Sequence, residues 1–341
     1  SESDIAETLV KCGLDRRLVL AASMRQGAHR GRGLLYDAEL RNRNVQKLIA
    51  PIMFLWCPEP EAWDREENTE EVFFVDAGHG VEENPDAPMC PTRCLWIWVH
   101  PSAESDTHAS LSHAADMVVR EDAFARNVSA SCQVKRIELT WLSGAGLFEL
   151  TGPRSIEVLG RTLPLADSNN SSAHIWREIT TSSRAKVPPA GAVLALDLNA
   201  ELLNSCVTRG AGGAVKSSSH PWVGKWPEHA SAGSSLWEAL RGLTTSGATV
   251  SGRLSVLVIF RDSDSLGGVD VVLPIGAAKK IWLRCVFASA RILGVSDRHA
   301  LHTEAGLHDF PFDFPETLAG DAVASSEASL SIEKYAKRPP A

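Results

Sequence analysis

Short apolar runs of strand length recur along the chain, separated by polar segments rich in glycine, proline and serine. Runs of this length between turn-forming residues are typical of buried strands. They predict strands at residues 18–23, 34–36, 52–56, 95–100, 134–139, 147–150, 191–198, 254–260 and 269–273. Apolar positions at helical spacing predict helices at residues 9–17, 111–126, 155–163, 236–241 and 281–293. Together these elements predict an α+β fold, with mixed or antiparallel sheets and helices packed on them.

The clearest local unit is a strand, a tight turn and a helix. The apolar strand at residues 147–150 is followed by Thr151, which can cap a helix, and by Gly152, which favours a turn. Pro153 suits the first helical position, because the N–H that proline lacks would have no partner there. The sequence therefore predicts a sharp turn from strand to helix at this point.

The composition is that of a folded protein, with 44% hydrophobic and 22% charged residues in a chain of 341. No segment approaches the uninterrupted apolar run of about 18 residues that a membrane-spanning helix needs. The first residues lack the basic and apolar regions of a signal peptide. Seven cysteines at irregular spacing do not resemble a secreted disulfide framework, so we expect a reducing compartment.

The charge of the chain is unevenly distributed. Residues 59–86 hold 11 acidic residues against one arginine, which predicts a surface insertion. Because this insertion carries a net charge of −10 and the whole chain −8, the rest of the chain carries +2. Lys and Arg supply most of a protein's affinity for nucleic acid by neutralising phosphates. A mildly basic body is therefore compatible with contact to nucleic acid at separate patches.

Two patterns that resemble nucleotide-binding loops are incomplete. Gly144 and Gly146 are followed by Glu149 where the third glycine of a dinucleotide-binding loop would lie. Lys225 follows a glycine, but Ser219 stands where a phosphate-binding loop needs another. We therefore expect no bound nucleotide cofactor.

Two clusters of titratable residues have the residue types of metal or catalytic sites. Cys90 and Cys94 lie near His79 and His100, but their spacing is not that of a structural zinc site. The second cluster is His299, His302, Glu304, His308 and Asp309. No acidic residue stands at the helical spacing of a di-metal site, so this segment is interpreted as a polar contact to the body or to a partner. We expect no metal, no cofactor and no catalytic residue, with His299 and His302 as candidate partner contacts.

A loop rich in arginine and glycine, residues 25–33, is the first candidate RNA contact. Arg25, His29, Arg30 and Arg32 are separated by glycines that let a backbone approach a ligand closely. Guanidinium groups suit phosphate oxygens and stack on bases, although a solvated surface loop would have the same composition. Further candidate RNA contacts are Arg41, Arg43, Lys47, Lys279, Lys280, Lys334, Lys337 and Arg338.

Ten tryptophans stand against only two tyrosines. Trp222 and Trp226 lie in a segment rich in proline and glycine, which makes them candidate contacts to another subunit or to RNA. The alternative is local packing, the more common use of an aromatic side chain.

Several stretches in order resemble the largest protein subunit of eukaryotic RNase P and RNase MRP. They are LIAPIMFLW at residues 48–56, LWIWVHPS at 95–102, FELTGPRSIEVL at 148–159, LWEALR at 236–241, and the segment 266–317, which resembles the POPLD domain. Two departures occur in that last segment. Val269 and residues 275–278 replace the tryptophan-containing patterns that usually flank its strand, whereas Gly306 and the alternating Phe and Pro residues at 310–315 are retained. The family's basic N-terminal region has no counterpart in this sequence.

The resemblance implies a non-catalytic, nuclear or nucleolar subunit that scaffolds a catalytic RNA and other protein subunits in precursor tRNA or precursor rRNA processing. It also implies a fold similar to the glycine-cleavage T-protein, a folate-dependent aminomethyltransferase, whose Leu-Thr-Gly-Pro-Arg-Ser unit resembles residues 150–155. The alternatives are therefore a folate-dependent enzyme or folate binder, and a structural subunit of another ribonucleoprotein such as telomerase or an organellar ribosome. No membrane partner is expected.

The predicted organisation has four parts. Residues 1–205 form the T-protein-like body with the acidic insertion 59–86, and residues 206–235 form a linker rich in glycine and serine. Residues 236–318 form the POPLD-like region, and residues 319–341 form an extended tail.

Overall fold

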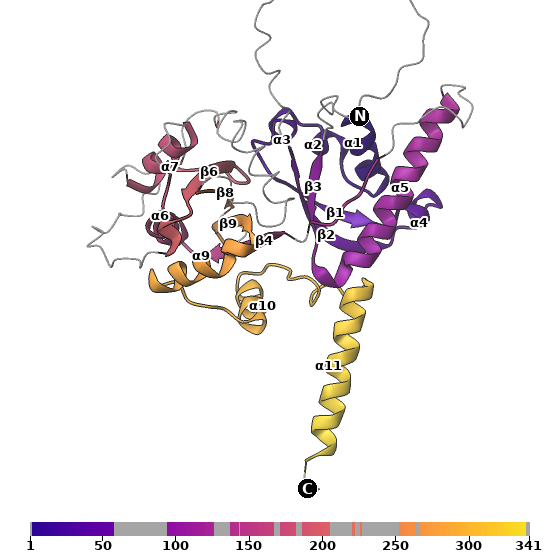
Figure 1. The fold of residues 1–341 in the computed structure, drawn as a ribbon. Helices are drawn as coiled ribbons and strands as arrows, with labels where there is room; N and C mark the ends of the chain where they lie inside the picture. The colour runs from indigo at the N-terminus through magenta and orange to yellow at the C-terminus, as the bar shows by residue number, and fades with distance from the viewer. Residues whose placement is uncertain are drawn as a thin grey trace, which may run out of the picture.

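The fold is described from a computed structural model. It describes residues 2–57, 94–125, 137–142, 144–166, 171–181, 186–204, 220–221, 226, 252–262 and 266–338. Two antiparallel sheets lie in the middle of the protein, and helices cover the outer face of each (Figure 1). The predicted α+β class with antiparallel sheets is confirmed.

The first sheet has the order β1 (Gly31–Tyr36), β2 (Leu48–Trp56) and β3 (Leu95–Trp98). Its outer face packs against α1 (Glu2–Lys11) and α5 (Glu104–Ala125), with Phe54 and Trp56 fully buried between the layers. The Trp56 Nε1–H donates to the Val19 carbonyl oxygen at 2.8 Å, which satisfies the polar edge of this buried ring.

The second sheet has the order β4 (Ala145–Thr151), β9 (Gly268–Pro274), β8 (Arg253–Arg261) and β6 (Val193–Asn199). Its outer face packs against α6 (Ser155–Thr162), α7 (Ser171–Thr181) and α9 (Ile275–Phe287). Both faces of its central strands are covered, which explains why their sequences are continuous apolar runs rather than alternating ones. Strands from both sides of the predicted linker 206–235 share this sheet.

The two sheets face each other across a smaller apolar layer. Leu55 of the first sheet packs there with Val193, Leu257 and Val272 of the second. The backbone also joins the sheets, because the Arg30 N–H donates to the Gly191 carbonyl oxygen at 2.8 Å. The predicted Arg/Gly loop is therefore wrong in part: residues 28–30 pair with residues 191–193 at the junction between the sheets.

The remaining short elements connect these layers. The helical turns are α2 (Arg16–Val19), α3 (Ala22–Arg25), α4 (Ala38–Asn42), η1 (Pro101–Ala103) and η2 (Leu202–Asn204). The strands β5 (Lys186–Val187) and β7 (His220–Pro221) form a short parallel pair.

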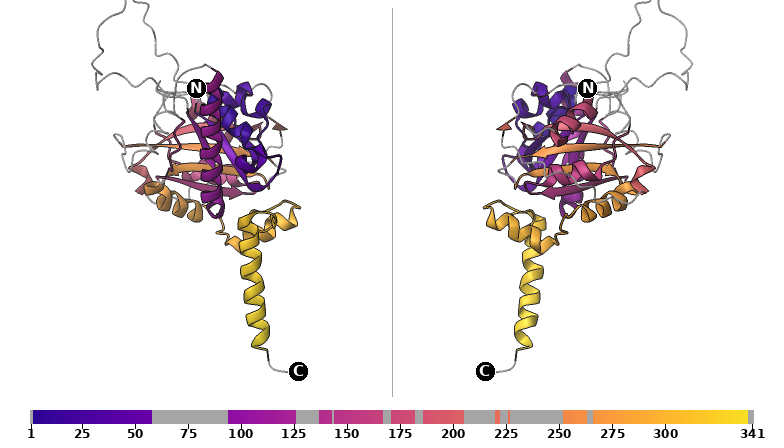
Figure 2. Two further views of the ribbon diagram at one scale, coloured as in Figure 1. Left: turned by 90° about the vertical axis from the view of Figure 1, so that its right-hand side faces the viewer. Right: turned by 90° about the vertical axis from the view of Figure 1, so that its left-hand side faces the viewer.

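Two helices follow α9 along the chain. Helix α10 (Val295–Glu304) lies beside the loop around the cis peptide Phe310–Pro311. Helix α11 (Leu318–Ala336) then projects away from the body (Figure 2). The prediction of an extended tail after residue 319 is therefore wrong, because Thr317 caps a helix whose serines and alanines tolerate helical geometry.

Most predicted elements are confirmed, with shifted ends. Strands 254–260, 191–198 and 269–273 and the unit at 147–163 are present. The helix predicted at 9–17 is confirmed only over residues 9–11, because α1 ends at Lys11 and residues 12–15 connect it to α2. The helix predicted at 281–293 begins at Ile275 and ends at Phe287. Ser289 has a positive φ of 76°, which stops helical continuation.

One strand prediction is wrong, and others cannot be compared. Residues 18–23 lie in α2, α3 and their connection, because the Asp15 side chain accepts a bond from the Arg17 N–H and starts a helical turn. The acidic insertion 59–86, the linker 206–235, the helix 236–241 and most of the strand 134–139 lie outside the described residues. In the part of the chain that the structure describes, no helix is long and apolar enough to cross a membrane.

Candidate functional site

Helix α9 presents the most distinctive surface of the second sheet's helical layer. Pro274 precedes it with an extended backbone, and Ala277, Ile281 and Cys285 bury its inner face against the sheet. The buried Arg284 side chain donates through Nε to the Thr162 carbonyl oxygen at 2.7 Å. It donates through Nη1 to the Leu202 carbonyl oxygen at 3.0 Å, so α9 is fixed to both α6 and η2.

The outer face of α9 combines lysines with large apolar side chains. Lys279 and Lys280 are exposed, and they lie on the same side as Trp282, Leu283 and Phe287. Phe287 is 63% exposed and Trp282 39%, although such rings are usually buried. We call these five residues the α9 face.

The charge around the α9 face has one sign. From Val271 to Ser296 the sequence contains no Asp or Glu, but it contains Lys279, Lys280, Arg284 and Arg291. Arg284 is buried against carbonyl oxygens, so the exposed charge comes from the two lysines and Arg291. On such a face the cations can bind phosphate groups, and the exposed aromatic rings can stack on bases.

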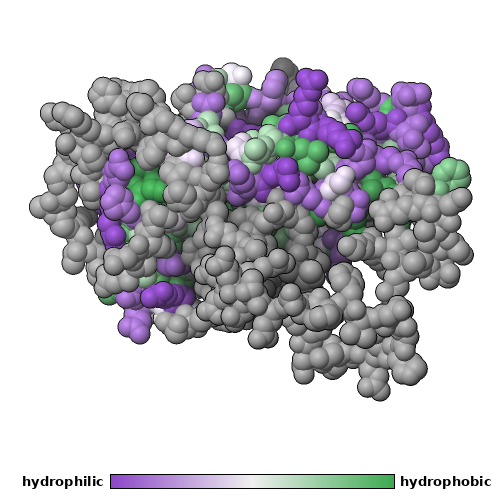
Figure 3. All heavy atoms as spheres, turned by 90° about the horizontal axis from the view of Figure 1, so that it is seen from above, coloured by the Kyte–Doolittle hydropathy of each residue, from purple (hydrophilic) through white to green (hydrophobic). Residues whose placement is uncertain are grey.

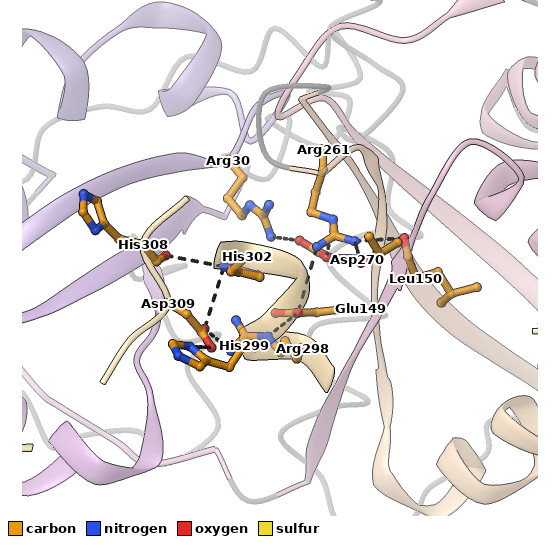
Figure 4. Close-up of polar contacts among 11 residues, drawn as sticks. Arg30, Glu149, Leu150, Arg261, Asp270, Arg298, His299, His302, His308 and Asp309 are labelled. Atoms are coloured by element: carbon orange, nitrogen blue, oxygen red, sulfur yellow. Dashed lines mark hydrogen bonds and ion pairs between the residues drawn. The ribbon is translucent and has the colours of Figure 1, made fainter. Parts of the chain in front are cut away.

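A buried ionic network lies at the other end of β9, where the two sheets join (Figure 4). Asp270 is its centre, and its Oδ2 lies 2.5 Å from the Arg30 Nη1. The side chains of both residues are only 2% exposed. Asp270 Oδ1 lies 3.2 Å from the Arg261 Nε, so one buried carboxylate is shared between two guanidinium groups.

The network continues to the surface through β4 and α10. Glu149 lies 3.9 Å from Arg261 and 3.3 Å from Arg298, measured between the nearest charged atoms. Arg298 Nη1 also lies 2.5 Å from the Oδ1 of the fully buried Asp309. Figure 4 shows these side chains converging from both sheets and from α10. The network therefore fixes α10 and the loop after it to the second sheet.

Two predicted partner-contact histidines belong to this network. His299 Nδ1 lies 3.5 Å from one Asp309 oxygen, and His302 Nδ1 lies 3.8 Å from the other. The His302 side chain is 16% exposed and the His299 side chain 34%. Their contacts in the described chain are to Asp309 and its loop, which fits the alternative that this polar segment holds a loop to the body.

The structure separates the four candidates of the Arg/Gly segment. Arg25 is exposed on α3 and forms an ion pair with Glu2. His29 is half-buried, and burial lowers its pKa below the usual value. Arg30 is buried, so its predicted RNA contact is wrong. Arg32 is exposed as a residue on β1, but partial desolvation of its guanidinium group lowers its pKa, and the nearby Arg30 lowers it further.

The other basic candidates are scattered over the surface. Arg41 lies 5.9 Å from the Tyr36 ring centroid, and Arg43 pairs with Glu39 at 2.8 Å. Lys47 is half-buried beside α5. At the end of α11, Lys334, Lys337 and Arg338 are exposed. None of these lies on the α9 face, but Arg338 lies 5.9 Å from the ring centroid of Tyr335, which is 74% exposed near the end of α11. Among the described candidates, only Lys279 and Lys280 lie on one face with more than one exposed aromatic ring.

Trp226 corrects a predicted partner contact. Its side chain is 3% exposed, and its ring packs edge-to-face on Phe260 with centroids 5.8 Å apart. Its Nε1–H donates to the Val193 carbonyl oxygen at 3.3 Å. Trp226 is therefore part of the core, and Trp222 lies outside the described residues.

Sequence reasoning missed Asp270, Arg261, Glu149 and Arg298. Arg30 and Asp270 are 240 positions apart, so no local pattern could join them. The only available signal was an acidic residue within the apolar strand 269–273, since a carboxylate on a buried strand needs a cationic partner.

Comparison with known proteins bears on the C-terminal part of this fold. Residues 268–341, which run from β9 through α11, match the POPLD (NUC188) domain. This part of the chain is therefore similar to the POPLD domain. Its β9 supplies Asp270, its α9 supplies the α9 face, and its α10 supplies Arg298.

Two curated relatives extend the comparison beyond the POPLD domain. The Ribonucleases P/MRP protein subunit POP1 of Arabidopsis thaliana is 24% identical over 87% of this chain and 41% of that protein. The protein of the same name from Homo sapiens is 35% identical over 82 residues, 23% of this chain and 8% of that protein. The chain thus spans less than half the length of either relative. These matches confirm the predicted resemblance to the RNase P/MRP subunit, at modest identity. The predicted similarity to the glycine-cleavage T-protein fold stays a prediction.

Proposed function

We propose that the chain is a non-catalytic protein subunit of an RNase P/MRP-type ribonucleoprotein that contacts RNA through the α9 face. It would support precursor tRNA or precursor rRNA processing in the nucleus or nucleolus, with phosphodiester cleavage carried out by the RNA. The two relatives support the assembly, because each is named as an RNase P/MRP protein subunit. The match to the POPLD domain covers the part of the chain that holds the α9 face.

The α9 face is the observation that carries the RNA contact. Lys279 and Lys280 lie in a stretch without acidic residues, and Trp282 and Phe287 are exposed beside them. Each lysine that neutralises a phosphate releases a counterion, and each exposed ring offers a platform for an unpaired base. An ordinary solvated helix face would carry both signs of charge and fewer large apolar groups.

The first experiment asks whether the chain belongs to such a particle. The tagged protein is purified from its native cells, and the RNA that co-purifies is sequenced. We expect one or two structured RNAs of the RNase P or RNase MRP type at near-stoichiometric amounts. Purification without RNA, or with telomerase or ribosomal RNA, would contradict the proposed function.

The second experiment tests the α9 face with a Lys279→Glu/Lys280→Glu double variant. The RNA from the first experiment is titrated with the chain at several salt concentrations. If both lysines contact phosphate in a single-stranded segment, the slope of log K against log salt becomes shallower by about 1.4. The matched control is Arg16→Glu/Arg17→Glu, which makes the same change of charge at exposed positions on α2. If both variants lose RNA affinity equally and their salt slopes change equally, the effect is not specific to the α9 face, and the proposed contact is wrong.

A further inference from the structure

A large cavity opens at the edge of the layer between the two sheets. Its volume is about 680 Å³, within the range of sites that hold a ligand of several residues or rings. Strand β3 of the first sheet and the start of β4 of the second sheet line this cavity. Residues 138–142 complete its wall. Ile275 at the beginning of α9 lies at its border.

The side chains around this cavity are mostly aromatic or aliphatic. Trp96 and Trp98 of β3 meet edge-to-face with centroids 5.9 Å apart, and Trp141 stacks on His108 at 5.7 Å. Every residue of β3 is half-buried, whereas the neighbouring β2 is buried at most positions. The apolar surface of β3 is thus only partly covered by the described chain, and Trp141 is 51% exposed.

Both strands that border the cavity are edge strands among the described residues. β3 pairs with β2 alone, and β4 pairs with β9 alone. The Ile275 N–H donates to the Gly144 carbonyl oxygen, which sets the alternation along β4. By this alternation, the backbone N–H and C=O groups of Ala145 and Leu147 point away from β9, toward the unpaired edge. An edge of this kind accepts an added strand.

A buried hydroxyl group within the cavity wall also lacks a partner. Thr107 is 2% exposed, and its Oγ1 has no hydrogen-bond partner among the described residues. A buried hydroxyl without a partner costs about 1–3 kcal/mol, so an occupant that offers a polar group would relieve this penalty. The occupant therefore needs hydrogen-bonding groups as well as apolar side chains.

The charge of the wall argues against nucleic acid. The lining contains Glu138 but no lysine or arginine, so a phosphate group would meet no counter-charge there. A polypeptide supplies apolar side chains, backbone donors and acceptors, and a basic side chain to face Glu138. These features contrast with the α9 face, where the cations lie.

We propose that this cavity receives an extended segment of another protein, which adds a strand to the edge of β4 and buries apolar side chains among the tryptophans. The proposal rests on the proposed function only because it assumes an assembly with other protein subunits. It divides the surface into a basic face for RNA and an apolar cavity for protein.

A site-specific crosslink in the native assembly tests this proposal. p-Benzoylphenylalanine replaces Trp141 at the cavity, and in a separate control it replaces Phe124, which is 89% exposed on α5. We expect the Trp141 position to crosslink to one peptide of one other protein, identified by mass spectrometry, and the Phe124 position not to. Crosslinks to RNA or to this same chain, or equal yields at the two positions, would overturn the proposal.

Two substitutions of Ala145 then test the mode of binding with the identified peptide, made synthetically. Ala145→Trp fills the cavity, whereas Ala145→Pro removes an N–H at the unpaired edge and leaves the bonds to β9 in place. We expect each to weaken peptide binding at least tenfold, with unchanged RNA affinity and a melting temperature that shows a folded protein. Unchanged peptide affinity in both variants would refute strand addition.

The two proposals fail in different ways. If RNA co-purifies but no protein crosslinks at Trp141, only the cavity proposal is wrong. If neither RNA nor another subunit co-purifies, the proposed function is wrong. Specific protection of Trp141 by a planar small molecule such as a folate would also overturn the cavity proposal, because the occupant would then not be a polypeptide.

Discussion

Replacing Asp270 with asparagine should destabilise the protein more than any change at the surface. Asn keeps the shape of the side chain but removes the charge, and Arg30 then loses its ion-pair partner at 2.5 Å while remaining 2% exposed. The Arg30 Nε already has no partner in the described chain. Leaving one member of a buried ion pair uncompensated costs about 3–5 kcal/mol.

The reverse change should cost less. In Arg30→Met, Asp270 keeps the Arg261 Nε at 3.2 Å, so its charge stays paired. The remaining penalty is that of an incompletely bonded buried group, about 1–3 kcal/mol. Urea unfolding at pH 7 measures both losses, and an unchanged slope with denaturant shows that stability alone has changed.

A surface pair supplies the control for this comparison. Glu39→Gln removes the partner of Arg43, whose side chain is 70% exposed, and it should cost about 0.3–0.5 kcal/mol. The reasoning is refuted if Asp270→Asn loses less than 1 kcal/mol. It is refuted equally if Arg30→Met costs as much as Asp270→Asn, because Arg261 would then not be sharing the carboxylate.

Three further predictions concern separate parts of the fold. Gly320→Ala should lower the melting temperature, because an added Cβ would overlap the Phe314 carbonyl oxygen, whereas Gly276→Ala in open space should be neutral or slightly stabilising. Burial lowers the pKa of His29, so the unfolded chain binds the proton more readily and the free energy of unfolding falls as the pH falls below about 6.5. His29→Gln should therefore reduce the difference between the free energies of unfolding measured at pH 7.5 and at pH 5.5. An unchanged difference would contradict this. Trp226→Ala should cost about 3–5 kcal/mol in urea unfolding, and a loss under 1 kcal/mol would place the ring at the surface instead.

The sequence predicts the second sheet well because its strands are buried on both faces. Residues 256–260 form an apolar run in which Val256 to Ile259 are fully buried. Such a run has few alternatives to a core strand. The turn at Gly152, where φ is 112°, was predictable for a similar local reason, since that backbone geometry favours glycine. The predicted cap at Thr151 and the predicted first helical position at Pro153 are wrong, because α6 begins at Ser155 with Arg154 at its N-cap.

Long-range pairing explains what the sequence could not show. Arg30 has the composition of a surface loop residue, and only the approach of β9 makes it a buried partner of Asp270. Trp226 likewise lies in a segment rich in proline and glycine, and its burial follows from the position of Phe260. Local composition predicts whether a residue suits water, but not which distant element covers it.

Several residues of the segment that resembles the POPLD domain have structural roles. Gly268 has a positive φ of 125°, and an added Cβ would overlap the Leu150 carbonyl oxygen across the β4–β9 pair. Asp270, two positions later, pairs with both Arg30 and Arg261. Asp309, just before the retained Phe310, is fully buried and pairs with Arg298. These positions hold the sheets and α10 together whatever the partner is.

The departures from the family pattern fall elsewhere. Val269, which stands where the resemblance implies a tryptophan, is fully buried, so a tryptophan at this position would require different core packing between β9 and its neighbours. Ile275, which opens the other altered stretch, is 58% exposed and borders the cavity, and Lys279 follows on the α9 face. The second departure therefore lies between the two surfaces proposed for protein and RNA. A change confined to that boundary would preserve the scaffold while altering what it binds, so exchanging residues 275–278 for the usual family pattern should change partner affinity and leave the Asp270 network intact.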